Sequence, residues 1–281
     1  MKWVILGSTG QLGAEFVDLL GKDCIGFSRQ SADLANPDAM EQSICSAKPE
    51  GVINCAAYNM VDKAEDHPLD AFETNSWGPK QLAGICQRHG WKLIHFSTDH
   101  VFSGNRKKPW LENDFTVPAN TYGLSKLAGE EWVRKTNSNS FIVRTCGLYG
   151  SRGRGGKGGN FVETMLRLAK GNYPIRVVSD QICNPSSAKE VAQATIQLVE
   201  HWQPGTYHLA NSGTCSWHEF ASTIMEIAGM DVRVEAIASS EFGSRACRPK
   251  YSALSSRWSG ENAFPALRTW RDALADYLKM R

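Results

Sequence analysis

The amino-terminal segment places the strongest constraint on the fold. Residues 3–6 (WVIL) form an apolar run typical of a buried strand, and a helical pattern continues to Leu20 after a turn that carries Gly7, Gly10 and Gly13. Such glycines let the backbone approach a pyrophosphate and let helix and strand pack closely, while the helix N-terminus faces the phosphates. The unit predicts a dinucleotide site, although an ordinary glycine turn is the alternative. The predicted residues are Gly7, Thr9, Gly10, Gln11, Leu12 and Gly13.

Strand and helix patterns then alternate along the chain. Strands are expected at residues 24–27, 51–54, 92–96 and 140–144, and helices at 37–47, 68–88 and 122–134. Beyond residue 150, helical periodicity returns at 161–169, 188–202, 217–228 and 267–278, with strands near 175–178 and 206–209. This alternation predicts an α/β protein with a Rossmann-like doubly wound parallel sheet.

The end of the second strand indicates the cofactor. Ser28 and Arg29 stand where an enzyme that selects NAD usually carries a carboxylate for the ribose 2′-hydroxyl. An arginine can pair with a 2′-phosphate, so NADP(H) is favoured; NAD(H), with Arg29 as a solvated loop residue, is the alternative. Further predicted cofactor contacts are Asp33 and Leu34, which could border the adenine, and Ala56, Ala57 and Tyr58 after the third strand.

Tyr122 and Lys126 lie four residues apart at the start of a helix, so they share one face. A free tyrosine has a pKa of about 10, and a nearby ammonium is expected to lower it. Such a pair can protonate a carbonyl oxygen during hydride transfer. Thr98, at the end of the fourth strand, could hydrogen-bond the same oxygen. An exposed helix face is the alternative for the pair.

Composition argues against several other classes of protein. The net charge of +2 over 281 residues gives no electrostatic reason to expect nucleic acid or membrane as a partner. No apolar run approaches the roughly 20 residues needed to cross a bilayer, and no cleavable leader is apparent, so a cytoplasmic protein is expected. The eight cysteines lack metal-binding spacing and are expected to be buried free thiols.

Together these motifs resemble the extended short-chain dehydrogenase/reductases, and more narrowly the dTDP-4-dehydrorhamnose reductases. The resemblance covers nearly the whole chain and includes the segments at residues 54–58, 61–65, 97–102, 122–130, 144–145, 160–161, 180–181, 205–208 and 248–249. It implies a catalytic triad of Thr98, Tyr122 and Lys126, in which Lys126 also holds the cofactor ribose. It adds Asn75 to the cofactor site. It implies these substrate contacts: Val61, Thr98, Asp99, His100, Gly147, Asn160, Phe161 and Arg248.

The resemblance also implies two domains: residues 1–150 as the NADP-binding domain, with return segments from the C-terminal half, and residues 151–281 as mainly the substrate lobe. The implied reaction is NADPH-dependent reduction of the 4-keto group of a nucleotide-linked 4-keto-6-deoxyhexose, most simply dTDP-4-dehydro-L-rhamnose to dTDP-L-rhamnose. The glycine-rich basic segment at residues 151–159 could close on a substrate pyrophosphate or be merely solvated.

Two departures from the family fall where the sugar should lie. Cys146 and Gly147 replace an aromatic residue that follows Arg144-Thr145 in the family, which predicts a wider site; His100 replaces a tyrosine. Some relatives bind magnesium between subunits through acidic side chains. Glu15 matches that pattern, but residues 189–193 retain too little acid, so no metal is expected.

Three alternatives stay open: a reductase or epimerase of another nucleotide sugar, a dehydratase, and a non-catalytic protein resembling the regulatory subunit beta of methionine adenosyltransferase. A dehydratase usually carries glutamate where this chain has His100. A monomer or a homodimer is expected.

Overall fold

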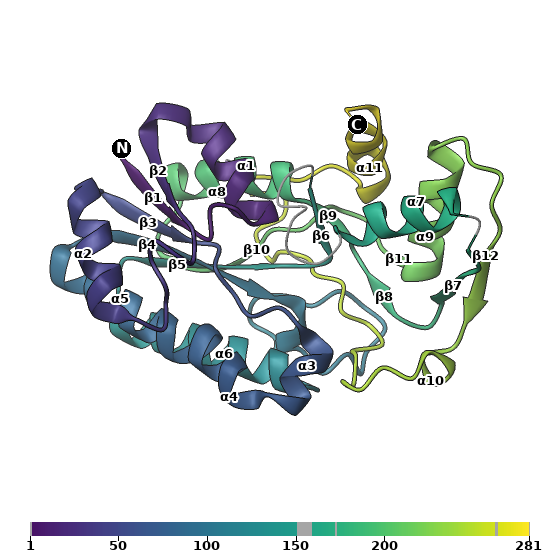
Figure 1. The fold of residues 1–281 in the computed structure, drawn as a ribbon, viewed down its shortest axis with the longest axis horizontal. Coiled ribbons are helices and arrows are strands. Elements are labelled where there is room, and N and C mark those ends of the chain that lie inside the picture. Colours follow the sequence, from purple (N-terminus) through teal and green to yellow (C-terminus); the bar gives the residue numbers. More distant parts are fainter. Residues whose placement is uncertain (1, 151–158, 172, 262–263, 281) are drawn as a thin grey trace.

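The computed structural model describes residues 2–150, 159–171, 173–261 and 264–280. A six-stranded parallel sheet with the order β10-β5-β4-β3-β1-β2 forms its centre (Figure 1). Its strands are β1 (Trp3–Leu6), β2 (Cys24–Phe27), β3 (Gly51–Asn54), β4 (Lys92–Thr98), β5 (Ser140–Thr145) and β10 (Gly205–His208). The predicted α/β fold with a doubly wound parallel sheet is confirmed.

Helices cover both faces of this sheet, which explains why β1 is a continuous apolar run that is buried along its whole length. Helices α1 (Gln11–Leu20) and α8 (Ala188–His201) lie on one face; α2 (Pro37–Ala47), α5 (Gly78–His89) and α6 (Thr121–Thr136) lie on the other (Figure 1). In β1, Trp3 and Ile5 enter the core beneath α1 and α8, whereas Val4 and Leu6 enter the opposite core. The sheet therefore presents its strand ends as a rigid edge.

The predicted helix at residues 68–88 is interrupted. It consists of α4 (Pro68–Phe72), a π-helical turn η2 (Glu73–Trp77) and α5, and the unpredicted helix α3 (Val61–Asp66) precedes it. The Asn75 side chain in the π turn accepts a hydrogen bond from the Tyr58 N–H and donates one to the Tyr58 carbonyl, both at 2.8 Å. The 3₁₀ turns are η1 (Gly21–Asp23) and η3 (Asp99–Val101).

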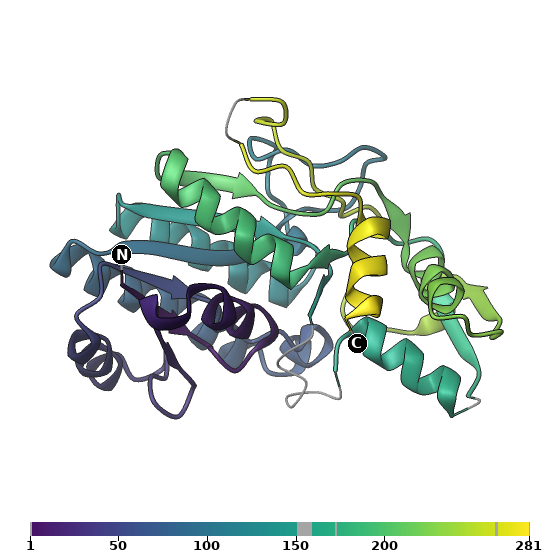
Figure 2. The same ribbon diagram turned by 90° about the horizontal axis from the view of Figure 1, so that it is seen from above.

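A second hydrophobic core lies in the C-terminal half, beside the main sheet (Figures 1 and 2). Helices α7 (Phe161–Lys170), α9 (Trp217–Ile227) and α11 (Trp270–Lys279) enclose it with the parallel pair β7 (Ile175–Val178) and β12 (Val234–Ile237). The remaining elements are β6 (Leu148–Tyr149), β8 (Ile182–Cys183), β9 (Ser186–Ser187), β11 (Cys215–Ser216) and α10 (Ser239–Phe242). Since β10 and α8 belong to the first core, a nucleotide-binding domain with return segments from the C-terminal half remains our proposal.

Several sequence expectations need adjustment. Leu267 precedes α11, and Trp202 and Ala228 lie just beyond their helices. The predicted loop at residues 151–158 lies outside the described residues. All eight cysteines are free, as predicted, but only four are buried: Cys86, Cys146, Cys183 and Cys215. Cys24, Cys45 and Cys55 are half-buried, and Cys247 is exposed. In the part of the chain that the structure describes, no helix has the length and apolar character needed to cross a membrane.

Candidate active site

Two adjoining cavities lie at the carboxyl ends of the sheet strands. The larger holds about 550 Å³ and the smaller about 170 Å³. Both are lined by Asn59, Thr98, Asp99, Tyr122 and Gly147. They therefore form one continuous site with Tyr122 and Thr98 at the junction.

The structure brings most of the predicted residues to these cavities. The larger cavity is lined by Gly7, Thr9, Gly10, Gln11, Leu12, Arg29, Asp33, Leu34, Ala56, Ala57, Tyr58, Tyr122 and Lys126. The smaller is lined by Val61, Thr98, Asp99, His100, Gly147 and Arg248. The sequence reasoning missed Asn59, Gln181, Trp217, Pro249 and Ser252, which also line the smaller cavity.

Five predicted residues lie outside the cavity walls, and each of them makes structural contacts instead. Gly13 packs α1 against the turn, where an added Cβ would lie 2.2 Å from the Gly7 carbonyl oxygen. The Ser28 N–H donates to Ser31 Oγ at 2.9 Å, within the turn after β2. Asn75 supports Tyr58 and also donates to Ser125 Oγ at 3.0 Å.

Asn160 begins α7, where its Oδ1 accepts the Glu163 N–H at 3.0 Å and its Nδ2 donates to the Gly150 carbonyl at 2.9 Å. The Phe161 ring packs against Phe220, with 5.7 Å between centroids, in the second core. The Asn160 and Phe161 side chains thus contact other parts of the protein and line neither cavity, so the structure does not place them against a substrate.

The start of α1 has the properties of an anion site. Gly7 has φ +72°, and a Cβ there would approach the Ala56 nitrogen to 2.8 Å, so only glycine fits without strain. The Gly10 N-cap offers no side-chain cap, and the first turn contains no acid. The first N–H groups of α1 are thus free of a capping side chain and suit a pyrophosphate.

Two buried oxygen atoms in the larger cavity support a polar ligand. Gln11 Oε1 and Thr145 Oγ1 are buried and have no hydrogen-bond partner among the described residues, and both side chains line the larger cavity. Buried polar atoms without partners are rare in folded proteins, because each costs about 1–3 kcal/mol. A bound dinucleotide would supply the missing partners, so the residues present fit such a cofactor.

Arg29 lies at the outer end of the larger cavity. Its Nε donates to Asp33 Oδ2 at 3.1 Å, and its side chain is 83% exposed. Burial raises the pKa of Asp33, but the Ala35 N–H and Arg29 outweigh this effect and hold that pKa below its ordinary value. Arg29 thus keeps terminal guanidinium nitrogens available for an anion.

Helix α6 delivers Tyr122 and Lys126 to the site. The Asn120 side chain caps it by accepting the Gly123 N–H at 2.8 Å. A Cβ on Gly123 would lie 2.2 Å from the His100 carbonyl oxygen, so this glycine lets the helix approach the end of β4. One helical turn separates Tyr122 from Lys126, as the spacing predicts.

The electrostatics of this pair differ from the expectation. Burial raises the pKa of Tyr122 to about 12; a hydrogen bond with Thr98 opposes the rise, and Asp99 adds to it. Burial lowers the pKa of Lys126 to about 8, against the effect of Glu130 and Cys55, and its Nζ donates to the Phe96 carbonyl at 2.6 Å. The expected lowering of the phenol pKa by Lys126 is therefore wrong, and Tyr122 stays protonated near neutral pH.

Polar side chains dominate the smaller cavity. The Thr98 hydroxyl donates to Asp99 Oδ1 at 3.0 Å and accepts the His100 N–H at 3.2 Å. Arg248 donates to Asp62 Oδ2 at 2.6 Å, and its buried Nε has no partner among the described residues. A ligand with several oxygen atoms suits this lining.

Helix α9 places an aromatic side chain beside Gly147, where the family's own aromatic residue is missing. Gly147 has φ +54°, and a Cβ there would lie 3.3 Å from Cη2 of Trp217 and 3.2 Å from Cα of Pro185. Trp217, the first residue of α9, lines the smaller cavity. Trp217 therefore supplies an aromatic side chain to the part of the site that the sequence predicts to be wider.

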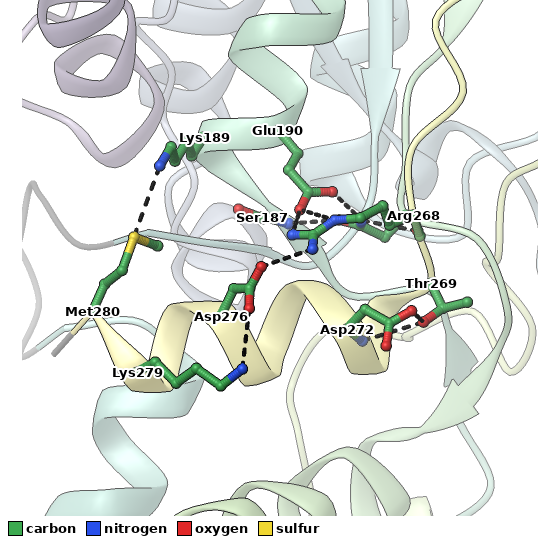
Figure 3. A network of polar contacts seen from close by, with 10 residues as sticks. Ser187, Lys189, Glu190, Arg268, Thr269, Asp272, Asp276, Lys279 and Met280 are labelled. Carbon is green, nitrogen blue, oxygen red and sulfur yellow. Dashed lines mark hydrogen bonds and ion pairs between the residues drawn. The ribbon is translucent and has the colours of Figure 1, made fainter.

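The acidic side chains near the start of α8 are already paired with a cation (Figure 3). Arg268 donates to Glu190 Oε1 from Nε at 3.0 Å and to Asp276 Oδ2 at 2.7 Å. Glu190 also accepts a bond from Asn211 at 2.7 Å. These residues do not offer the open carboxylates that magnesium needs, which supports the prediction that no metal binds there.

Comparison with known proteins agrees with this geometry. The model of the RmlD substrate binding domain family matches residues 1–281. The spore coat polysaccharide biosynthesis protein SpsK of Bacillus subtilis is 40% identical over 100% of this chain and 98% of its own length. The dTDP-4-dehydrorhamnose reductase of Mycolicibacterium smegmatis is 39% identical over 97% of this chain and 84% of its own.

A solved structure leads to the same assignment. The dTDP-4-dehydrorhamnose reductase of Bacillus anthracis, crystallised in complex with NADP, superposes with a TM-score of 0.94 at 37% identity, and the match covers 100% of both chains. The resemblance inferred from the sequence motifs is confirmed. The chain belongs to the RmlD substrate binding domain family.

Proposed function

We propose that this protein uses NADPH to reduce the 4-keto group of dTDP-4-dehydro-L-rhamnose, which yields dTDP-L-rhamnose. One observation carries the proposal: Tyr122 and Thr98 lie where the two cavities meet. A dinucleotide in the larger cavity and a sugar in the smaller one would thus meet at these two hydroxyl groups. The names of the relatives support this reaction and this cofactor.

NADPH, when bound, supplies the hydride that is added to C4 of the sugar. Tyr122 donates its proton to the developing alkoxide at O4, because its raised pKa keeps the phenol protonated near neutral pH. Thr98 is proposed to hydrogen-bond O4. Since the Thr98 hydroxyl donates to Asp99, it must rotate to donate to O4.

Lys126 is proposed to hold the nicotinamide ribose through its ammonium group. At pH 7 this group is mainly charged, since the pKa is lowered only to about 8. The first-turn N–H groups of α1 are proposed to bind the pyrophosphate, and Arg29 the 2′-phosphate.

The direct test follows NADPH oxidation with dTDP-, UDP- and GDP-linked 4-keto-6-deoxyhexoses and identifies the products. Turnover of dTDP-4-dehydro-L-rhamnose at the highest kcat/KM supports the proposal, and no turnover of any member refutes it. Preference for another sugar favours the second candidate, a 4-ketoreductase of a different nucleotide sugar, which His100 and the Gly147–Trp217 arrangement make worth testing.

A tightly held enzyme partner in a pull-down, without turnover, would instead indicate a regulatory subunit. We further propose that the protein acts in the cytoplasm as a monomer or homodimer. Its free cysteines suit a reducing compartment, and light scattering on the purified protein measures its mass.

A further inference from the structure

The smaller cavity has an aromatic wall contributed by the C-terminal half of the chain. We propose that the Trp217 indole is a binding subsite for the apolar C–H face of the sugar, a 6-deoxyhexose. The inference rests on the proposed function, and it adds a residue that the sequence motifs do not reveal. Trp217 lines this cavity together with Tyr122 and Thr98.

Gly147 and Trp217 are complementary in size. The indole carbon Cη2 lies 3.3 Å from the position that a Cβ on Gly147 would take, so the ring covers this glycine closely. A side chain at residue 147 would meet the indole and the Pro185 backbone, and its φ of +54° would add strain. The aromatic surface at this place therefore has to come from α9.

The indole is held firmly from behind. Its ring packs against Phe161, with 4.7 Å between centroids, and against Phe220 at 6.1 Å. The backbone N–H of Trp217 donates to the backbone carbonyl of Gln181 at 3.3 Å, which connects the start of α9 to another segment of the cavity wall. A ring fixed before binding loses little side-chain entropy when a ligand arrives.

The rest of the lining explains which ligand face meets the indole. The other residues of this lining are mainly ones with hydrogen-bonding side chains, namely Thr98, Asp99, His100, Gln181, Arg248 and Ser252. A hexose has hydroxyl groups on some sides and C–H groups on others, and the C6 methyl of a 6-deoxyhexose enlarges its apolar part. The hydroxyls would pair with the polar wall, so the C–H face would lie on Trp217.

Calorimetric titration with dTDP-L-rhamnose and with dTDP separates the sugar's contribution from that of the nucleotide. Trp217→Ala should weaken dTDP-L-rhamnose binding about tenfold, the scale of a lost aromatic anchor, while dTDP affinity stays nearly constant. Trp217→Phe should lose only about threefold, because a ring remains. Trp77→Ala is the matched control, since Trp77 is half exposed and lines neither cavity.

Thermal unfolding identifies any variant that loses its fold. If Trp217→Ala does not fold, Trp217→Phe still tests the subsite. Equal losses for dTDP and dTDP-L-rhamnose, or no loss for either, would overturn the subsite. A wild-type protein that binds dTDP-L-rhamnose no better than dTDP would do the same. If wild type reduces no 4-keto sugar but Trp217→Ala still loses sugar affinity selectively, the proposed function fails and the subsite stands.

Discussion

Asn120 determines which nitrogen of His100 carries the proton. Its Oδ1 accepts the Gly123 N–H at 2.8 Å, and its Nδ2 donates to the Cys247 carbonyl at 2.8 Å. These partners fix the amide orientation, because an N–H only donates and a carbonyl only accepts. The second Nδ2 proton, 3.0 Å from His100 Nδ1, must therefore be donated to that nitrogen. The neutral His100 ring consequently carries its proton on Nε2, as a donor for the smaller cavity.

Asn120→Asp should make this donor depend on pH. In the wild type, burial lowers the pKa of His100; Asp99 and Asp62 oppose this effect, and Arg248 adds to it. The ring is therefore neutral at pH 7. An aspartate would accept from Nδ1 and raise the pKa of His100. Below that pKa the imidazolium keeps both N–H groups, and above it the remaining proton lies on Nδ1, so the Nε2 donor is lost as pH rises.

The expected loss is that of one hydrogen bond, about 0.5–1.5 kcal/mol, or roughly 2- to 12-fold in the KM for the nucleotide sugar. KM should increase in Asn120→Asp as the pH rises through the raised pKa of His100, and the wild type should lack this step. Aspartate preserves the helix cap, but it faces the Cys247 carbonyl, so thermal unfolding must show that the variant is folded.

Variants of His100 provide the control. His100→Gln retains a side-chain N–H and should show no pH step, whereas His100→Phe should raise the KM at every pH. A folded Asn120→Asp variant whose KM follows the wild-type pH profile would refute the reasoning about the His100 proton.

Three further predictions concern the cofactor and the core. Arg29→Ala should weaken NADPH binding by only about 1 kcal/mol, or about fivefold in Kd, because Arg29 is 83% exposed and solvent screens its charge. The affinity for NADH should stay nearly unchanged. Equal losses of affinity for NADPH and NADH in titrations would contradict recognition of the 2′-phosphate. NADPH affinity of the wild type should fall as pH rises through about 8, where Lys126 loses its charge, and Lys126→Met should bind weakly without that step; a wild-type Kd that is constant over this range would count against the ribose contact. Glu130→Ala should lower the free energy of unfolding by about 3–5 kcal/mol, because it leaves the buried Arg144 unpaired, whereas Glu131→Ala in the exposed pair with Arg134 should cost less than about 1 kcal/mol in the same denaturant experiment.

The nucleotide-binding half was predictable because its signals are local. The strand, glycine turn and helix at residues 3–20 follow one another directly, and the spacing of Tyr122 and Lys126 places them on one helical face. Strand ends of a parallel sheet meet at one edge, so the residues after them could be assigned to one site before any contact was known.

The sugar end was harder because its contacts join distant parts of the chain. Trp217 meets Gly147 across 70 residues, and Asn120 meets the Cys247 carbonyl across 127. Two-residue strands such as β8 and β11 are too short to show a period. The pKa of Tyr122 followed burial rather than the nearby lysine, and burial depends on packing that spacing alone does not specify.

The central claim is that Tyr122 donates the proton to the reduced carbonyl, and Tyr122→Phe tests it most directly. The ring and its packing remain, so NADPH affinity should stay nearly unchanged while kcat falls about 10²- to 10⁴-fold. Tyr207→Phe is the matched control, since it also removes one hydroxyl, which bonds the Gln203 carbonyl at 2.7 Å away from both cavities. A folded Tyr122→Phe enzyme with kcat close to that of Tyr207→Phe would contradict the account.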